Sequence, residues 1–529
     1  MTTTDRATVI GGARSPLGYW SLTLGPGESH ISRAELASIP ANLGNPLLSI
    51  GHLSDLHLCD SQSPARADFL DRWADDDSPL KSTLGIIGSY RAQDCVTVQV
   101  GEAMVRALNA VRRGPVGGAP LDWAITTGDV TDNAHANELG WYINLLDGGP
   151  IVPDSGDRSR YEGSADHDYW NESYWHPDPS SQHGPDRPRR LHGFPDAPGL
   201  LDALREPFTA GGLQMPWLAV HGNHDQLIQG KVNATGSLGE GSTAGQRAID
   251  VPPDWSLDQI ARFCAGVDSC DPATLALWST LPVREITADP LRRIISRDDF
   301  IGAHFHDRAR PIGHGFSRDA PHTAYYRYDH QQITVLVLDT VNEHGGWQGS
   351  IEPGQLAWLE SELVSADAEK RYIVLASHHT SEDLVNDTVS PGAPRRVLGA
   401  EFAAALEGHP CLILWLNGHT HISRVTAHPG RHPWWEVTTP SLIDFPQQGR
   451  IVEVLRADNA VLTIATTMLD HSGELPWSGA TDSVLAIAGL SRELAANDSQ
   501  WRVPDLSLHV GGGTAADRNV LLHLVDPYG

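Results

Sequence analysis

The sequence is poor in basic side chains, and lysine is especially rare. It contains 38 Lys and Arg residues against 66 Asp and Glu residues, which gives a formal net charge of −28 at pH 7. Its lysines are Lys81, Lys231 and Lys370. Proteins that bind nucleic acids or anionic membranes use Lys and Arg to neutralise phosphate groups. The composition therefore disfavours a nucleic-acid or membrane partner, although bound metal ions can still attract a small anion.

Long apolar runs and paired cysteines are also missing. No stretch reaches the roughly 18 apolar residues that a membrane-spanning helix needs, and the N-terminus shows no apolar leader followed by a cleavage site. We therefore expect a cytoplasmic protein. The five cysteines form no CxxC pair. A Cys264–Cys270 disulfide is one alternative, but unpaired thiols fit this pattern better.

What the chain does contain is a series of short apolar runs, each followed by polar residues that can bind metals. Runs of this length, rich in branched residues and bounded by Gly, Asp and His, are typical of buried strands. The runs with their polar ends are LLSIGHLSDLH (47–57), WAITTGDVTDN (123–133), MPWLAVHGNHD (215–225), YIVLASHHTS (372–381) and CLILWLNGHTH (411–421). Polar clusters at the carboxyl ends of strands are characteristic of α/β sheets that build a site at one edge.

Helical patterns lie between these strands. Val100, Met104, Leu108 and Val111 fall on one helix face, and the segment GQLAWLESEL repeats such a pattern. Alternation of strands and helices predicts an α/β protein with layered sheets.

Irregular segments interrupt this alternation. We expect an N-terminal extension (1–46), a catalytic domain (47–470) with insertions at about 150–210 and 226–320, and a C-terminal extension (471–529) that packs on the core. The first insertion is dense in Pro, Gly, Asp, His and aromatic residues. Two interpretations remain open for it: a lid over the site, or a surface excursion or oligomer contact.

The polar clusters share one chemistry. They combine carboxylates, imidazoles and one amide oxygen, a mixture that suits first-row transition metals better than Ca²⁺ or a thiolate-bound zinc site. A single cluster of this kind is weak support for a metal site. Five clusters in order, each closing a predicted strand, make coincidence an unsatisfactory explanation.

The ordered motifs DLH…GD…GNHD…HH…GHTH resemble those of the calcineurin-like metallophosphoesterase superfamily. Their layout is most similar to class III cyclic-nucleotide phosphodiesterases and glycerophosphodiesterases, over about 47–425. The resemblance implies a four-layer α/β/β/α sandwich with two mixed β-sheets, here with large insertions, and two metal ions (Mn, Fe, Zn or Co). The purple acid phosphatase branch has a Tyr ligand after its GD motif. Here Val130, Thr131 and Asp132 follow, so that branch does not fit.

The resemblance also assigns roles to individual residues. Three residues would hold the first metal, three the second, and one would bridge them: Asp55, His57 and His421; Asn223, His378 and His419; and Asp129. His224 matches the catalytic imidazole, and Asp225 would orient it. His378 is preferred to His379 as the ligand because it comes first after the strand.

Other residues carry weaker predictions. Substrate contacts are assigned to Arg66, Asn133, His135, His344 and His379, although structural roles are common for such residues. Asp444 and Arg450, after the last site strand, favour a supporting or structural role.

Together these observations predict a dinuclear, metal-dependent hydrolase for a small-molecule phosphodiester. The resemblance implies attack by a metal-bridging hydroxide, with His224 assisting the leaving group. The alternatives are a phosphomonoesterase resembling nucleotidases, a nuclease, and a non-catalytic scaffold on the same fold. The net charge counts against the nuclease. Homo-oligomers are compatible with the sequence, which does not identify the substrate.

Overall fold

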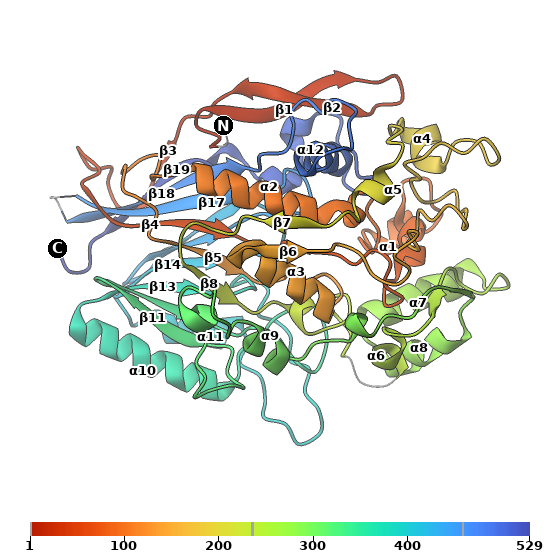
Figure 1. The fold of residues 1–529 in the computed structure, drawn as a ribbon. Coiled ribbons are helices and arrows are strands. Elements are labelled where there is room, and N and C mark those ends of the chain that lie inside the picture. The colour runs from red at the N-terminus through yellow and green to blue at the C-terminus, as the bar shows by residue number, and fades with distance from the viewer. Residues whose placement is uncertain (1–2, 234–236, 458–459) are drawn as a thin grey trace.

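Two mixed β-sheets form the centre of the protein, seen in a computed structural model that describes residues 3–233, 237–457 and 460–529 (Figure 1). In spatial order the seven-stranded sheet contains β3 (Ile31–Leu36), β19 (Val520–Val525), β18 (Val461–Asp470), β17 (Gln448–Arg456), β4 (Asn45–Leu53), β5 (Trp123–Thr127) and β8 (Trp217–Val220). Strands β4, β5 and β8 are parallel, so their carboxyl ends meet at one edge.

The second sheet has six strands and also contains a set of parallel neighbours. In spatial order it contains β11 (Tyr326–His330), β12 (Ile333–Val337), β13 (Tyr372–Ala376), β14 (Leu412–Asn417), β16 (Trp434–Thr438) and β15 (Arg424–His428). Strands β12, β13, β14 and β16 are parallel, and β11 and β15 are antiparallel edge strands.

Side chains alternate between two cores along the second sheet. In β12, Val335 and Val337 join the core shared with the seven-stranded sheet, whereas Leu336 belongs to a separate core with Leu359 and Leu363. This alternation follows from the two-residue period of a strand and requires a layer on each face of the sheet.

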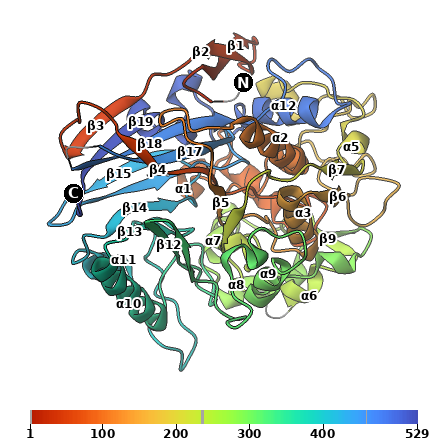
Figure 2. The same cartoon turned by 60° about the vertical axis from the view of Figure 1, so that its left-hand side comes forward.

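Helices supply the two outer layers. On the seven-stranded side lie α2 (Thr97–Ala110), α3 (Ala136–Asp147) and α12 (Val484–Ala495), and on the other side lie α10 (Pro353–Glu369) and α11 (Gly399–Leu406) (Figures 1 and 2). The predicted four-layer α/β/β/α sandwich is therefore confirmed. The five predicted strands are present, and the first predicted helix ends one residue before Val111, which is in an extended conformation.

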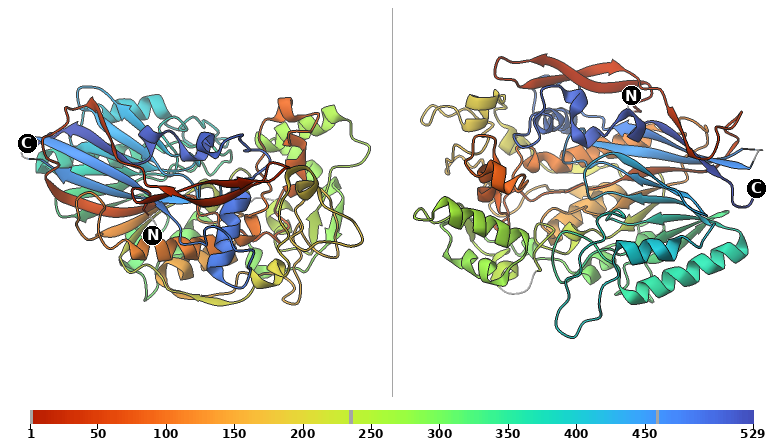
Figure 3. Two further views of the ribbon diagram at one scale, coloured as in Figure 1. Left: turned by 90° about the horizontal axis from the view of Figure 1, so that it is seen from above. Right: turned by 180° about the vertical axis from the view of Figure 1, so that it is seen from behind.

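The two insertions build separate structures. The first contains β6 (Gly149–Ile151), α4 (Arg187–His192), α5 (Leu200–Ala203) and β7 (Phe208–Ala210), and its Trp175 and Leu200 pack in one cluster with Leu490 of α12. The second contains α6 (Ser237–Gly241), β9 (Gln246–Ala248), α7 (Leu257–Asp268), α8 (Pro272–Ala276), β10 (Val283–Glu285) and α9 (Arg297–Ala303). Helices α7 and α8 lie near α1 (Lys81–Leu84), at one end of the sandwich (Figure 3).

Both chain ends contribute to the seven-stranded sheet. β3 and β19 pair in parallel at its edge, and β19 also pairs with β18. A hairpin of β1 (Ala7–Arg14) and β2 (Trp20–Pro26) lies beside α12 (Figure 1). Cys264, Cys270 and the other cysteines are free thiols, as expected. Within the described ranges, no helix is long and apolar enough to cross a membrane.

Candidate dinuclear metal centre

The predicted ligands converge where the carboxyl ends of both sets of parallel strands meet. Asp55 and His57 follow β4, Asp129 follows β5 and Asn223 follows β8. From the other sheet, His378 follows β13, and His419 and His421 follow β14. Although these residues span more than 360 positions of the chain, the carboxylate and imidazole side chains fall into overlapping groups of three whose ligand atoms lie within 4.8 Å of one another.

The first group of ligands consists of Asp55, His57 and His421. Their ligand atoms all lie within 4.8 Å of one another. The Nε2 atoms of His57 and His421 are 3.1 Å apart, and His421 Nε2 lies 3.5 Å from Asp55 Oδ1. Two imidazole nitrogens that face each other beside a carboxylate match the donor set of a transition-metal site.

The second predicted group consists of His378, His419 and Asn223. His378 Nε2 lies 3.1 Å from His419 Nδ1. The Asn223 amide donates to the Gly230 carbonyl oxygen at 3.0 Å, which leaves its Oδ1 atom buried without a hydrogen-bond partner. A buried carbonyl oxygen without a partner is costly, and a cation at this point would remove the cost. The residues present therefore fit the metal that the motifs imply.

Asp129 lies between the two groups. Its Oδ2 atom is 3.2 Å from His378 Nε2 and 3.9 Å from His57 Nε2. Its Oδ1 atom accepts a hydrogen bond from the main-chain N–H of His224 at 2.8 Å, which fixes the carboxylate plane. One carboxylate oxygen is thus directed toward both groups, as a bridging ligand requires.

The backbone is strained at most of these ligands. Asp55, His57, Asp129, His419 and His421 all have φ between 44° and 68°. A side chain in this left-handed region costs on the order of 1–2 kcal/mol, and such residues concentrate at functional sites. The strain directs two ligands of a short motif, such as Asp55 and His57, into the same space.

Three of the four predicted ligand histidines are oriented by a contact of the other ring nitrogen. His57 Nδ1 is 3.0 Å from Asp132 Oδ1, and His378 Nδ1 donates to the Thr127 carbonyl oxygen at 2.8 Å. His421 Nδ1 lies 2.6 Å from Asp444 Oδ2. These contacts leave Nε2 of these three rings facing the centre, the arrangement typical of metal-binding histidines, whereas His419 presents Nδ1 to His378.

The site concentrates negative charge. Burial lowers the pKa of the His378 imidazole, but the neighbouring Asp129 carboxylate outweighs burial and raises the pKa to about 9. Burial opposes protonation of His421 in the same way, and hydrogen bonds to Asp444 and Asp55 raise its pKa to about 10. A field that stabilises added protons also stabilises metal cations.

The structure distinguishes His378 from its neighbour. Both ring nitrogens of His379 have partners: Nδ1 lies 2.7 Å from the Thr340 hydroxyl, and Nε2 donates to the Trp347 carbonyl oxygen at 3.0 Å. Burial lowers the pKa of His379 to about 3. A ring nitrogen of His379 lies within 4.8 Å of ligand atoms of His378 and His419, but both nitrogens of His379 already have partners, so His378, which faces Asp129, fits the ligand role better.

His224 lies beside the first group, but Asp225 does not orient its ring. His224 Nδ1 donates to the main-chain oxygen of Asp132 at 2.6 Å. The Asp225 carboxylate instead accepts from the N–H groups of Val130 and Thr131 at 3.0 and 2.9 Å, so it holds the loop after Asp129. The predicted Asp225–His224 contact is wrong, because the Asp225 carboxylate is turned toward that loop.

His224 Nε2 is the ring nitrogen left for the cavity. The side chain is 20% exposed, and burial lowers the pKa of the imidazole to about 4. With Nδ1 donating to a carbonyl oxygen, the neutral ring carries its free lone pair on Nε2.

Of the predicted substrate contacts, some border the cavity and others do not. Arg66 borders the cavity but is buried in ion pairs with Asp68, Asp94 and Asp132. His135 is buried and contacts the Ser63 hydroxyl at 2.6 Å. The structure does not place Asn133, His135 or His344 in the cavity lining: Asn133 is buried and donates to Glu138 Oε1 at 2.6 Å, and His344 Nδ1 contacts the Ser390 hydroxyl at 3.0 Å.

A cavity of about 270 Å³ opens onto the centre. Its lining includes the metal-site residues His57, Asp129, Asn223, His419 and His421. The other walls come from segment 65–91 and from the second insertion, with Trp347 and Trp501. No lining residue belongs to 150–210, so this arrangement favours the surface interpretation of the first insertion.

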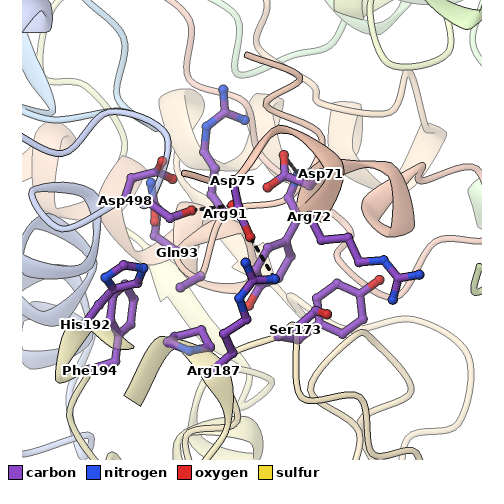
Figure 4. A pocket seen from close by; sticks show the side chains of 15 residues that line it. Asp71, Arg72, Asp75, Arg91, Gln93, Ser173, Arg187, His192, Phe194 and Asp498 are labelled. Atoms are coloured by element: carbon purple, nitrogen blue, oxygen red, sulfur yellow. Dashed lines mark hydrogen bonds and ion pairs between the residues drawn. The ribbon is translucent and has the colours of Figure 1, made fainter. Parts of the chain in front are cut away.

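The residues that hold the ligand side chains in place come partly from segments without a recognisable motif. Asp444, expected to support the site, contacts both His421 and Arg91; Arg91 Nε lies 2.6 Å from Asp444 Oδ1. Arg91 also borders a separate polar cavity of about 40 Å³, where Asp71, Asp75 and other charged residues gather (Figure 4). Nothing near Arg91 in the sequence pointed to this role. Asp132, which contacts His57, could have been suspected from the sequence, because it lies only three residues after Asp129.

Comparisons with known proteins give partial matches. Two curated relatives are manganese-dependent ADP-ribose/CDP-alcohol diphosphatases of Xenopus tropicalis and Xenopus laevis, 29% identical over 109 and 107 residues. The matches cover 20% of this chain and 29% and 28% of those proteins, so the chain matches less than a third of their length. No model of a protein family matches.

Solved structures also include similar chains at low identity. A dimetal phosphatase from Danio rerio is 10% identical with a TM-score of 0.35, covering 81% of this chain and 100% of that one. A purple acid phosphatase from yellow lupin seeds is 10% identical with a TM-score of 0.30, covering 86% and 55%. The order of the ligand motifs and the two-sheet fold agree with the metallophosphoesterase resemblance, and the curated relatives fit it.

Proposed function

We propose that this chain is a metal-dependent phosphoric ester hydrolase that acts on a small-molecule phosphodiester. The observation that carries the proposal is the position of Asp129 Oδ2, 3.2 Å from His378 Nε2 and 3.9 Å from His57 Nε2. Around this oxygen, carboxylate and imidazole groups from both sheets gather in overlapping groups, among them Asp55, His57 and His421, and Asp55, Asp129 and His378. Hydrolysis of phosphate esters is the chemistry for which paired metal sites of this kind are suited.

In this proposal each side chain of the centre has a defined task. Asp55, His57 and His421 hold one metal, Asn223, His378 and His419 hold the other, and Asp129 joins them. Two bound metals would supply Lewis-acid activation of water and of the phosphoryl oxygens. The neutral Asn223 amide adds no negative charge to its ligand set, which preserves the electrophilic character of that position.

His224 protonates the leaving group. Its Nδ1–H is held by the Asp132 carbonyl oxygen, so Nε2 is the atom that accepts and delivers a proton. A phosphate anion bound beside the ring favours the protonated imidazole and raises its pKa from the low value of the free protein. General acid assistance of this type contributes roughly 10²–10⁴-fold to a rate.

The acidic composition supports a small substrate. A net charge of −28 disfavours a polyanion such as nucleic acid, and the cavity of about 270 Å³ is small for a ligand pocket. The phosphomonoesterase alternative differs from the proposal only in the substrate, so the same assay decides between them.

The test combines metal analysis with hydrolysis of bis-p-nitrophenyl phosphate and p-nitrophenyl phosphate by the Mn²⁺-supplied protein. We expect about two metals per chain and faster cleavage of the diester. Asn223→Ala should abolish activity, while Asn144→Ala, at a half-buried position that contacts the Pro150 carbonyl oxygen, serves as the matched control. Cleavage of the monoester alone would select the phosphomonoesterase, and absence of metal from the wild type would reject the proposal.

A further inference from the structure

Much of the cavity lining outside the predicted metal ligands is apolar. Its apolar side chains include Leu70, Ile87, Ile228, Val267, Leu275 and Trp278. We call these six residues the apolar wall. Leu70 belongs to the 3₁₀ helix η1 (Asp68–Ala74) and Trp278 to η4 (Leu277–Thr280), while Val267 and Leu275 lie in α7 and α8. Most of the wall therefore comes from the second insertion.

This wall rests on a core of its own. The Trp278 ring packs edge-on against Phe69, with ring centroids 5.6 Å apart, and also contacts Phe263 at 6.4 Å. Phe69 and Phe263 are 2% and 3% exposed and belong to a cluster separate from the cores of the two sheets. The wall is thus a packed surface that keeps its shape.

Apolar lining also continues to the metal ligands. The Trp347 ring borders the cavity and lies nearly parallel to the His419 ring, with 26° between the planes and 5.8 Å between the centroids. A ligand whose phosphoryl group contacts the centre would therefore place its adjoining group between aromatic and aliphatic side chains.

The cationic side chains of the cavity are already paired. Among the described residues of the lining, Arg66 contacts three carboxylates, Arg91 contacts Asp444, and Lys231 Nζ lies 2.5 Å from Asp268 Oδ1. A substrate with a second phosphate group needs cations to receive it. Recruiting these residues would break existing ion pairs, so the lining is better suited to a single phosphoryl group.

The volume limits the size of the apolar group. An apolar protein cavity of about 150 Å³ is large enough for benzene. The cavity of about 270 Å³ therefore has room for a phosphoryl group and one compact ring system.

We propose that the cavity recognises phosphate esters with a single phosphoryl group bonded to a compact apolar group, preferably aromatic, which packs against the apolar wall. This inference rests on the proposed function and specifies its substrate class. It separates this chain from enzymes that require two linked phosphates.

The experiment measures binding of two non-hydrolysable probes, methylphosphonate and 1-naphthylphosphonate, to the Mn²⁺-loaded protein by calorimetry. Burial of an aromatic ring should make the naphthyl compound bind roughly 10- to 100-fold more tightly. Leu275→Trp, and independently Val267→Phe, should fill the cavity beside the apolar wall. Each variant should remove the difference in affinity between the two probes while the Kd of methylphosphonate stays unchanged. Leu277→Trp, an adjacent leucine that is 41% exposed and outside the lining, is the matched control and should behave as the wild type.

Equal affinity of the wild type for the two probes would overturn the inference, as would a naphthyl preference that survives in both filling variants. Tighter binding of ADP-ribose, a molecule with two linked phosphates, than of 1-naphthylphosphonate would also overturn it. Metal content, measured on each sample, keeps this result separate from the proposed function. A metal-loaded protein that shows the naphthyl preference but cleaves no phosphate ester contradicts the proposed function alone.

Discussion

Asp444 is expected to control metal binding at one position of the centre without being a ligand. Its Oδ2 atom lies 2.6 Å from Nδ1 of His421, and this contact raises the pKa of that imidazole, against the effect of burial. Asp444→Asn keeps the shape of the side chain and an acceptor oxygen but removes the charge. Loss of such a partner typically weakens metal binding roughly 10- to 100-fold, which corresponds to about 1.4–2.7 kcal/mol.

The assay is a competition titration of the metal-free protein with Mn²⁺ and a chelator, which resolves two binding steps. The step assigned to Asp55, His57 and His421 should weaken, whereas the step assigned to the other group should keep its affinity. Asp298→Asn is the matched control, because Asp298 makes a similar 2.7 Å contact with Nδ1 of the 75% exposed His322. Unchanged affinity at both steps, or an equal loss at both, would refute the reasoning.

Four further predictions concern the centre itself. His224→Ala should keep both metals but lose roughly 10²–10⁴-fold in turnover; near-normal turnover in a stopped assay would remove it from the mechanism. Asp129→Asn should lower the metal content below two per chain, and two metals by elemental analysis would argue against a bridge. Metal affinity should rise with pH, because His378 and His421, with pKa values of about 9 and 10, must release protons to bind metal; flat affinity between about pH 6 and 8, roughly one to three units below the lower pKa, contradicts this. Gly418→Ala should abolish metal binding, because the added Cβ would lie 1.8 Å from a neighbouring hydroxyl and 2.3 Å from a ligand carboxylate; two bound metals in this variant would disprove that crowding.

The substrate preference that we infer has a structural cause outside the ligand motifs. The motifs place the predicted ligands at the edge of the sheets, whereas the second insertion supplies most of the apolar wall of the cavity. Because substrate choice and reaction then depend on different segments, changes in the insertion alter which ester binds without altering the reaction.

Much of the centre follows from the sequence because its information is local. Each ligand motif directly follows a run of buried apolar residues, so a strand and its polar end are visible within about ten positions of the chain. Asp55 and Asp129 could be identified in this way, and parallel strands place such ends at one edge. Five motifs in a fixed order then indicate both the fold and the paired metals.

Tertiary structure alone decided the contacts that join distant segments. The Arg91–Asp444 pair spans 353 positions, and no local pattern relates the two residues. Asp225 shows the same limit within a single motif, because its adjacency to His224 in sequence does not set the direction of its carboxylate. The two insertions likewise lack periodicity, and only their packing against different cores shows that 226–320, rather than 150–210, borders the cavity. The sequence by itself determined which chemical groups are present at the ends of the strands, because strand propensity and motif spacing are local. Only the folded chain determined which groups meet across the sandwich, because those contacts depend on how the separate layers pack together.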